Sequence, residues 1–502
     1  MISNLMRIIT LSCIFLFSGG HLIAQQSFEL IIDELNLFEK SNRITEVGNN
    51  RYVSTLTREI EAAQNYTKSY LSLVLISNQG EVLAIDSIMQ NDTFISLKYL
   101  LPIGENGLLC FGMYGFFNSD FGFEPLGSQI SFFDLSDNTF NLQYLKKFRT
   151  FNNDDLYYWS TPPVIKPGTD SCFVGWSSEY TGSHQLFCLN ALTGDSLFLK
   201  DITVPSNWSV EGLFYTHNDT SMLLHYTIDG WSEYSNIIVR LDDQYELSGD
   251  TLFSLNTHLY SLDTKAMSHP NGNIYIGGEA KWVDWETMQM YKHSGVFSYS
   301  SNFEPLQSVY LTHPDTSSQS AFLETMSLAP DGSIYIASNY NYKGHPFSGT
   351  PTMIYLARLD ENLNTIWEKY IGGDRHYIVF AIASTSDQGV IVSGYGYDLN
   401  FPETRGFAWI VKYNPDGTVG FENEIRQQQE LVVYPNPTAD HIHIKSLQKG
   451  SLMVYNSSGQ LVIQRQLKQG LNQINLSALP GGTYFIHSLT NKQSQRQKIV
   501  KY

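Results

Sequence analysis

The chain has 502 residues, 42% of them hydrophobic, so it can bury a large core and is longer than a typical single domain. Tyrosine (31) and phenylalanine (29) are abundant while charged residues make up only 16%, a balance that favours strands over solvated helices and predicts an all-β protein. The net charge is −18; eight Lys and Arg against two acids give the part from Gln429 onward +6, so residues 1–428 carry −24. An acidic body repels phosphate backbones, which argues against nucleic acid as a partner.

The N-terminal 24 residues have the pattern of a secretory signal peptide. Arg7 precedes an apolar run at residues 8–17, and a small residue, Ala24, comes just before Gln25. The run is shorter than the roughly 20 residues of a membrane-spanning helix, so we expect cleavage rather than anchoring. Cys13 lacks the leucine expected three positions earlier in a lipoprotein signal, so no lipid anchor is predicted. We therefore expect a signal peptide at 1–24 and an N-terminal segment at 25–43.

Cleavage would leave three cysteines, Cys110, Cys172 and Cys188, too few for a disulfide framework. Cys172 and Cys188 lie symmetrically about Tyr180 and could face each other across a hairpin, so one disulfide is left open. We favour small buried thiols.

A short phrase recurs along the chain. The segments PNGNIYIGG (270–278), PDGSIYIAS (330–338) and SDQGVIVSG (386–394) each place a turn glycine before an apolar run. We expect the glycine to supply a positive φ and the run to form a strand. Weaker copies extend the alignment to seven turn positions, 50 to 63 residues apart: Asn50, Gly107, Asp170, Thr220, Gly272, Gly332 and Gly389. Such a spacing predicts a propeller or a solenoid.

Each repeat continues into a second hairpin, clearest in MIYLARLDENLNTIWEKYIGG (353–373). Two hairpins make four antiparallel strands, the composition of a propeller blade. The predicted fold is a seven-bladed β-propeller with four-stranded blades at residues 44–425; six or eight blades and a β-helix are the alternatives.

One stretch, LDENLNTIWEKYIGGDRHYIVFAIASTSDQGVIVSGYG (359–396), resembles the repeat of secreted bacterial propellers. The resemblance implies a fold far more than an activity, because many functions share this repeat. Thr385, Asp387 and Gly389 are also similar to the Asp-box of sialidase-type propellers, but the terminal Trp of that motif is missing, so no sialidase activity is inferred.

The C-terminal part follows a polar linker at residues 426–430. Ile442 and Ile444 alternate with His441 and His443, as in a half-buried strand. The histidines could share one face and bind a metal, but we favour the solvated side of a sheet, and no metal or cofactor is predicted. Six or seven short strands predict a small immunoglobulin-like β-sandwich at 431–502.

The tail contains three short motifs, VYPNP, LSALPGGTYFIHSL and the closing KIVK, with a further glycine in YNSSGQLV. Together they resemble the type A sorting domain of the type IX (Por) secretion system of Bacteroidetes. The residues that carry the resemblance are Pro435, Asn436, Pro437, Gly459, Leu479, Pro480, Gly482, Tyr484 and Lys498. The resemblance implies a periplasmic intermediate, an outer-membrane translocon that reads the tail, and a sortase-like peptidase that removes it and commonly joins the cargo to surface lipopolysaccharide. We expect a secreted or cell-surface protein.

Six predicted loops follow the second strand of their repeats and are rich in aromatic residues. In a propeller such loops emerge on one face, where rings can stack against sugars or protein side chains. The candidate ligand-binding residues are Trp176, Trp231, Trp282, Trp285, Tyr340, Tyr342 and Phe401. The predicted function is a non-catalytic glycan- or protein-binding module; the opposing interpretation is that these rings pack between blades.

Catalysis has less support from the sequence. There is no G-x-S-x-G elbow, H-E-x-x-H helix, P-loop or Cys/His metal spacing, and no catalytic residue is assigned. Carboxylates of the same loops and one histidine leave an alternative, a secreted polysaccharide-active hydrolase or lyase: Glu279, Asp284, Glu286, Asp398 and His345. A purely structural surface protein is the third possibility.

Overall fold

The computed structural model consists of strands and turns, and no helix occurs among the residues that it describes. Those residues are 7–10, 27–33, 38–62, 66–87, 94–118, 122–149, 157–178, 183–203, 208–217, 221–228, 235–247, 253–255, 259–284, 289–312, 318–342, 351–399, 406–419, 433–434, 436–446, 450–456, 461–490 and 493–502. Within them, no helix is long and apolar enough to cross a membrane. The chain divides into two compact units, Met1–Phe421 and Glu422–Tyr502. The all-β class is confirmed.

Four sheets of the first unit each consist of four antiparallel strands in chain order. Sheet 1 contains β3 (Phe38–Val47), β4 (Arg51–Ala62), β5 (Tyr66–Ile76) and β6 (Val82–Ser87). Sheet 2 contains β7 (Phe94–Ile103), β8 (Gly107–Asn118), β9 (Gly122–Asp134) and β10 (Asn141–Arg149). Sheet 4 contains β16 (Trp208–Tyr215), β17 (Met222–Ile228), β18 (Ser235–Arg240) and β19 (Phe253–Leu255). Sheet 5 contains β20 (Leu259–Ser268), β21 (Ile274–Asp284), β22 (Gln289–Tyr299) and β23 (Pro305–Leu311).

In two further sheets the first strand is divided into two short pieces that pair with the same neighbour. Sheet 3 contains β11 (Tyr157–Trp159), β12 (Val164–Ile165), β13 (Ser171–Ser178), β14 (His184–Asn190) and β15 (Ser196–Ile202). Sheet 6 contains β24 (Ser318–Ser320), β25 (Met326–Leu328), β26 (Ile334–Tyr340), β27 (Met353–Leu359) and β28 (Thr365–Ile371).

Sheet 7 combines the two ends of the first unit. Its strands β29 (His376–Ser384), β30 (Val390–Tyr397) and β31 (Gly406–Tyr413) come from the end of the unit, whereas β2 (Phe28–Asp33) comes from its beginning and pairs antiparallel with β31. β1 (Arg7–Thr10), which lies within the predicted signal peptide, pairs with β2. Phe28, Leu30 and Ile32 are each at most 1% exposed. The segment before residue 44, whose structure the sequence left open, thus contributes β2 to sheet 7 and β3 to sheet 1.

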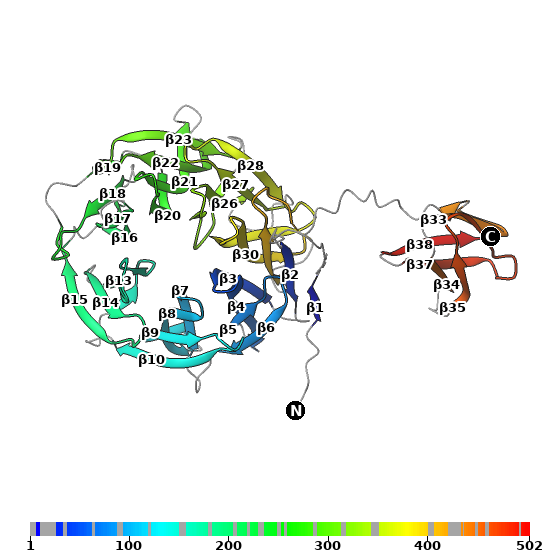
Figure 1. Cartoon of the computed structure of the whole chain (residues 1–502), viewed down its shortest axis with the longest axis horizontal. Coiled ribbons are helices and arrows are strands. Elements are labelled where there is room, and N and C mark those ends of the chain that lie inside the picture. The colour runs from blue at the N-terminus through cyan, green and yellow to red at the C-terminus, as the bar shows by residue number, and fades with distance from the viewer. Residues whose placement is uncertain are drawn as a thin grey trace, which may run out of the picture. The chain divides into compact units, whose positions relative to one another are not determined.

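The sheets of the first unit lie around a common centre (Figure 1), which gives a propeller-like arrangement. First strands such as β3 and β7 lie toward the centre, and fourth strands such as β10 and β23 lie at the periphery. Sheet 7 meets sheet 1, because β3 packs against β29, β30 and β31. The Ser386 hydroxyl and amide also donate hydrogen bonds to the Glu46 carboxylate, at 2.8 and 2.5 Å.

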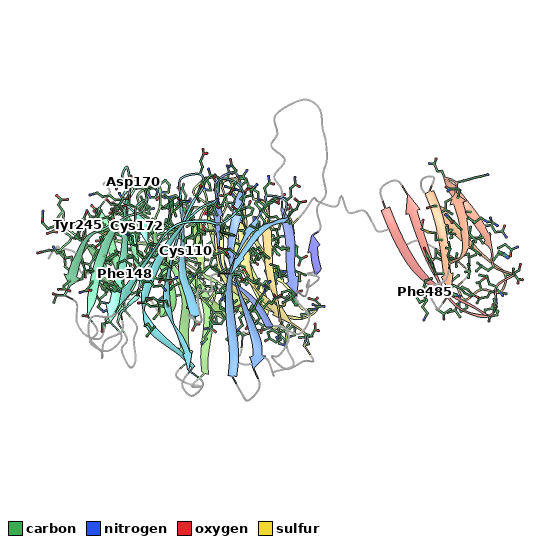
Figure 2. The ribbon with its side chains drawn as sticks, turned by 90° about the horizontal axis from the view of Figure 1, so that it is seen from below. Cys110, Phe148, Asp170, Cys172, Tyr245 and Phe485 are labelled. Atoms are coloured by element: carbon green, nitrogen blue, oxygen red, sulfur yellow. The ribbon has the colours of Figure 1, made fainter. Side chains whose placement is uncertain are left out.

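The repeated phrase marks the turn between the first and second strands of each sheet, and Figure 2 shows one such turn residue, Asp170, at an edge of the unit. Gly272 and Gly332 have φ values of 89° and 86°, as the turn requires. At the last copy the positive φ of 68° belongs to Gln388, which corrects the expectation that Gly389 supplies it. A Cβ atom at Gly389 would lie 2.3 Å from the Tyr413 carbonyl oxygen, so close backbone approach is the reason for that glycine.

The hydrophobic core of the first unit is a series of layers between neighbouring sheets. Cys172 belongs to the layer between sheets 2 and 3, whereas Cys188 belongs to the layer between sheets 3 and 4. The register explains this, because Cys172 pairs with Leu189 and Phe173 with Cys188, so the two thiols point to opposite faces. Both cysteines and Cys110 are free and buried, consistent with the favoured interpretation.

The second unit consists of two sheets that enclose one core. One sheet contains β32 (Val433–Tyr434), β33 (His441–Ser446) and β36 (Gly470–Asn475). The other contains β34 (Gly450–Asn456), β35 (Leu461–Leu467), β37 (Gly482–Thr490) and β38 (Gln493–Lys501). Ile442 and Ile444 of the first sheet and Ile486 and Ile499 of the second share this core and are fully buried. Alternating burial along β33 agrees with the predicted half-buried strand.

Candidate functional site

Among the described residues, each of the seven sheets of the first unit has an irregular first strand, and first strands such as β3 and β7 lie toward the centre of the ring. In sheets 1, 2, 4, 5 and 7 the pairing register shifts within this strand. In sheets 3 and 6 the strand is divided between β11 and β12 and between β24 and β25. Because a bulge changes the direction of a side chain, these positions can direct side chains toward the centre. The residues at the irregularities include Arg43, Lys98, Glu211, Lys265, Glu324 and Phe380.

Glu324 accepts hydrogen bonds from cations of two other sheets. Its Oε1 lies 3.2 Å from Nη1 of Arg43 in sheet 1, and its Oε2 forms an ion pair with Nζ of Lys265 in sheet 5. The same Nη1 donates to the Leu323 carbonyl at 3.0 Å. Sheet 7 lies between sheets 6 and 1 in the ring, so the Arg43–Glu324 contact joins two sheets that are not neighbours.

Arg43 also contacts the next sheet. Its guanidinium carbon lies 4.9 Å from the ring centroid of Tyr99, and the Tyr99 hydroxyl donates to the Ser160 carbonyl of sheet 3 at 3.1 Å. Burial, followed by the positive charge of Arg43, lowers the pKa of Lys98 to about 8, and the carboxylate of Glu211 counteracts part of this decrease. We call Arg43, Lys98, Tyr99, Glu211, Lys265 and Glu324 the central network.

An aromatic cluster, defined as Phe322, Tyr342, Phe380 and Tyr395, adjoins the central network. The Phe322 ring lies 5.6 Å from Tyr342 and 5.2 Å from Phe380, and Phe380 lies 5.6 Å from Tyr395. The amides of Leu323 and Glu324 donate to the Phe380 carbonyl, which fixes the cluster to the central network. All four rings are only partly buried, so parts of their faces are available to a ligand.

The predicted ligand-binding residues lie in different places. Tyr342 belongs to the aromatic cluster, whereas Tyr340, also partly buried, lies 4.8 Å from the ring of Tyr370 on the outer strand β28. The backbone of Trp282 lies in β21, where it pairs with Tyr291 of β22. Three predicted residues lie outside the described part of the chain: Trp231, Trp285 and Phe401.

Trp176 is 5% exposed and packs between sheets 2 and 3. Its ring stacks on Trp159 with centroids 5.6 Å apart, and Phe187 lies 5.9 Å away. Its indole nitrogen donates to the Ser128 hydroxyl at 3.2 Å. This placement corresponds to the packing interpretation, since stacked neighbours cover the ring.

Two of the carboxylates considered for catalysis are engaged in ion pairs. Glu279 lies 3.1 Å from Lys292, and Asp398 lies 3.1 Å from Arg375. The side chain of Asp284, together with Glu286 and His345, lies outside the described residues. No group of three or more metal-ligating side chains occurs among the described residues, and the rings of His441 and His443 are 5.4 Å apart.

The central network was missed at the sequence level, although the repeat carries a signal for it. Extending the aligned phrase toward the N-terminus places five charged residues seven to nine positions before the turn residue: Arg43, Lys98, Glu211, Lys265 and Glu324. A charged residue that recurs at nearly the same distance before the turn is a pattern that could have identified the centre of the ring.

In the second unit the three sorting motifs converge. The Asn436 side chain donates to the Lys498 carbonyl and accepts from the Val500 amide, both at 2.9 Å. The hydroxyl of Tyr484, a residue that is 5% exposed, donates to the Pro480 carbonyl at 2.7 Å, and the amide of Leu479 donates to the Leu476 carbonyl. Pro437 and Gly482 lie in described segments, whereas Pro435 and Gly459 do not.

Both units together define a class of protein, an all-β chain with a propeller-like body and a small C-terminal β-domain built on three convergent motifs. Residues 432–502 match the family model of the secretion system C-terminal sorting domain, so the second unit is a type IX (Por) sorting domain. The predicted resemblance is confirmed. A sorting domain of this family indicates interaction with the type IX machinery and export to the cell surface or beyond it.

No curated protein matches the chain. Among solved structures, hydrazine synthase of Kuenenia stuttgartiensis is similar at 10% identity and a TM-score of 0.44, covering 78% of this chain and 98% of its own. The β-propeller domain of the trilobed protease of Pyrococcus furiosus is similar at 12% identity and a TM-score of 0.41, covering 74% and 94%. The polysaccharide lyase Uly1 is similar at 11% identity and a TM-score of 0.44, covering 75% and 90%.

Proposed function

We propose that the first unit is a seven-bladed β-propeller that binds a glycan or protein ligand at the centre of its ring, without catalysing a reaction. A signal peptide at 1–24 leads the chain to the periplasm, and the sorting domain then directs the propeller across the outer membrane. The partly buried aromatic cluster beside the central network is the observation that carries this proposal.

The blade assignment is supported by the topology. Among the described residues, the first unit contains seven sheets, and each is antiparallel with its strands in chain order apart from the contribution of β1 and β2 to sheet 7. Each sheet is one blade, and β2 completes the last one. For the second unit, two sheets around one core support an immunoglobulin-like sandwich.

The site favours binding because its rings and charges come from several blades. Phe322 and Tyr342 belong to blade 6, Phe380 and Tyr395 to blade 7, and Arg43 to blade 1. A ligand at the centre would contact several rigid sheets at once. Because such a surface is already ordered, little conformational entropy would be lost on binding. The Glu324 carboxylate is shared by two cations, so its role in the site is that of a structural ion pair.

A glycan array and a protein pull-down with the purified chain identify the ligand, and titration of Tyr342→Ala tests the site. We expect roughly a tenfold loss of affinity, about 1.4 kcal/mol, from the removal of one stacking ring. Tyr310→Ala is the matched control, because Tyr310 is 50% exposed on the peripheral strand β23.

Three results would decide against this proposal. Equal affinity of Tyr342→Ala and the wild type would place the ligand elsewhere. Release of reducing ends or unsaturated sugars, abolished by a carboxylate substitution, would instead establish the polysaccharide-active enzyme. Absence of any ligand would leave a structural surface protein.

A further inference from the structure

The larger sheet of the second unit, with its strands in the order β35–β34–β37–β38, has an apolar outer face. Successive side chains of a strand point to opposite faces of the sheet, and Tyr484, Ile486 and Ile499 belong to the core. Phe485 (Figure 2) and Val500 therefore point away from the core, and they are 46% and 37% exposed.

The pairing register extends this face across the whole sheet. Phe485 pairs with Tyr455 of β34 on one side and with Lys498 of β38 on the other. Tyr455 in turn pairs with Leu461 of β35, which is 44% exposed. Directly opposed residues of an antiparallel sheet share a face, so one row of side chains crosses all four strands. We call Tyr455, Leu461, Phe485, Lys498 and Val500 the sorting-domain patch.

The sorting-domain patch is bounded by polar surface in the described part of the second unit. In the next row of the same face, Met453 lies opposite Gln464, an exposed polar side chain. On the outer face of the three-stranded sheet, Leu471 is 61% exposed, but His443 and Gln473 beside it are polar. Single exposed apolar residues are ordinary, whereas a contiguous apolar patch marks a site of interaction.

Two of the three sorting motifs meet in the patch. Phe485 lies within LSALPGGTYFIHSL and Lys498 within the closing KIVK. Other groups of these motifs stabilise the fold, since the Tyr484 hydroxyl donates to the Pro480 carbonyl and the Lys498 carbonyl accepts from Asn436. The Phe485 ring and the Lys498 amine take part in no hydrogen bond, ion pair or ring contact among the described residues. These two side chains are therefore available to a partner.

We infer that the sorting-domain patch is the surface by which the second unit docks on an outer-membrane protein of the type IX machinery, whose matching surface is apolar with carboxylates beside it. Resting on the proposed function, in which the sorting domain directs export, this specifies the contact surface. Carboxylates on the partner would complement Lys498 and the charge of +6 from Gln429 onward. A second copy of the domain would bring two such positive charges together, which disfavours self-association.

Export of the full chain in a host with type IX machinery tests the patch. Phe485→Ala and Leu461→Ala should each lower the ratio of surface to periplasmic protein, and the double variant should lower it roughly tenfold, because large apolar side chains dominate the energy of a contact. Both side chains are nearly half exposed, so the melting temperatures of the purified variants should stay close to that of the wild type. Leu471→Ala, an exposed leucine on the other sheet, is the matched control and should export within about twofold of the wild type.

A charge reversal tests the predicted carboxylates of the partner. Lys498→Glu should lower the ratio of surface to periplasmic protein about tenfold, because it places like charges opposite each other. Lys468→Glu reverses an exposed lysine outside the patch and should export within about twofold of the wild type. Equal losses in the two variants would mean that net charge, rather than the patch, is recognised.

Photo-crosslinking identifies what occupies the patch. The photoreactive residue p-benzoylphenylalanine at position 461 of the full chain should capture an outer-membrane protein of the type IX machinery, identified by mass spectrometry. The same residue at position 471 should not capture it. Capture of a second copy of the chain, or of lipid alone, from position 461 would overturn the inference.

The export assays also separate this inference from the proposed function. Suppose that the patch variants reach the surface as the wild type does, while a chain lacking residues 431–502 stays in the periplasm. The patch would then not be the docking surface, although the sorting domain would remain the address. Arrival of the truncated chain at the surface would instead contradict the proposed role of the sorting domain itself.

Discussion

Lys412 of β31 is a cation with none of its side chain exposed, and Asp387 is its partner at 2.5 Å. Burial raises the pKa of the Asp387 carboxyl, but the hydrogen bond and charge of Lys412, aided by Thr385 and the Gly389 amide, outweigh it and lower the pKa below the ordinary value. The motif that resembles an Asp-box therefore acts here as an anchor between a turn and the strand β31.

The variant Asp387→Asn should lose about 3 kcal/mol of unfolding free energy, because Lys412 would remain buried without a counter-ion. The amide oxygen can still accept the bonds that Oδ1 receives from Thr385 and Gly389, so the substitution isolates the charge. Urea denaturation measures the loss. The double variant with Lys412→Met should be more stable than Asp387→Asn alone, since it removes the buried cation that has lost its ion-pair partner.

The pH dependence gives a second readout of the same pair. A carboxyl whose folded-state pKa is lowered contributes stability above its unfolded-state pKa of about 3.9, and that contribution disappears as pH falls through the folded-state value. The stability of the wild type relative to the double variant should therefore decrease on acidification below about pH 4, because the double variant has no carboxyl at this position to protonate. A constant difference between pH 7 and pH 3 would show that the ion pair adds nothing.

For single residues, the sequence predicted where turns and aromatic side chains occur better than it predicted what each residue does in the structure. The turn at residues 385–389 was expected, yet its positive φ belongs to Gln388. The glycine at position 389 is needed for another reason, because its backbone lies too close to Tyr413 for any side chain. Trp176 was expected on a loop and is instead part of an inter-sheet stack, since aromaticity alone does not reveal which face of a strand a residue occupies.

At the scale of secondary-structure elements, β2 pairs with a strand, β31, that lies far away in the sequence. Glu29 accepts a hydrogen bond from the indole of Trp409, 380 residues away, at 2.9 Å. The alternation of Phe28, Leu30 and Ile32 is that of a half-buried strand, but a local pattern cannot name a partner at such a distance. For this reason the sequence predicted a ring without showing how it closes.

Leu30→Ala should cost about 2–5 kcal/mol, because the fully buried side chain fills the layer between sheets 7 and 1. Hydrogen exchange of the β31 amides at residues 408–412 should accelerate in the same variant, as the closing strand detaches more often. Leu197→Ala, at a 52% exposed position of the peripheral strand β15, should change stability by less than about 0.5 kcal/mol. Similar losses in the two variants would mean that β2 is not a closing element.

For the whole molecule, function is divided between two units with opposite charge. The sorting domain was identified from sequence because its motifs are dense, and the structure supplies the physical reason for their spacing. Asn436 bonds to the backbone of β38, and Thr438 bonds to Val500 of the same strand, while β32 just before them pairs with β33 in the other sheet. The PNP motif thus connects the two sheets. Its Asn436 side chain bonds to the backbone of the closing segment at Lys498 and Val500.

Export is the property that this architecture predicts most directly. In a host with type IX machinery, the full chain should reach the cell surface, and a chain lacking residues 431–502 should accumulate in the periplasm, as fractionation and surface proteolysis would show. Asn436→Ala should reduce export, because it removes two hydrogen bonds of about 1 kcal/mol each that hold the PNP motif on β38. Gln464→Ala, on an exposed position of β35, should export normally. If the truncated chain reached the surface as efficiently as the full one, the address would have to lie in the propeller-like body.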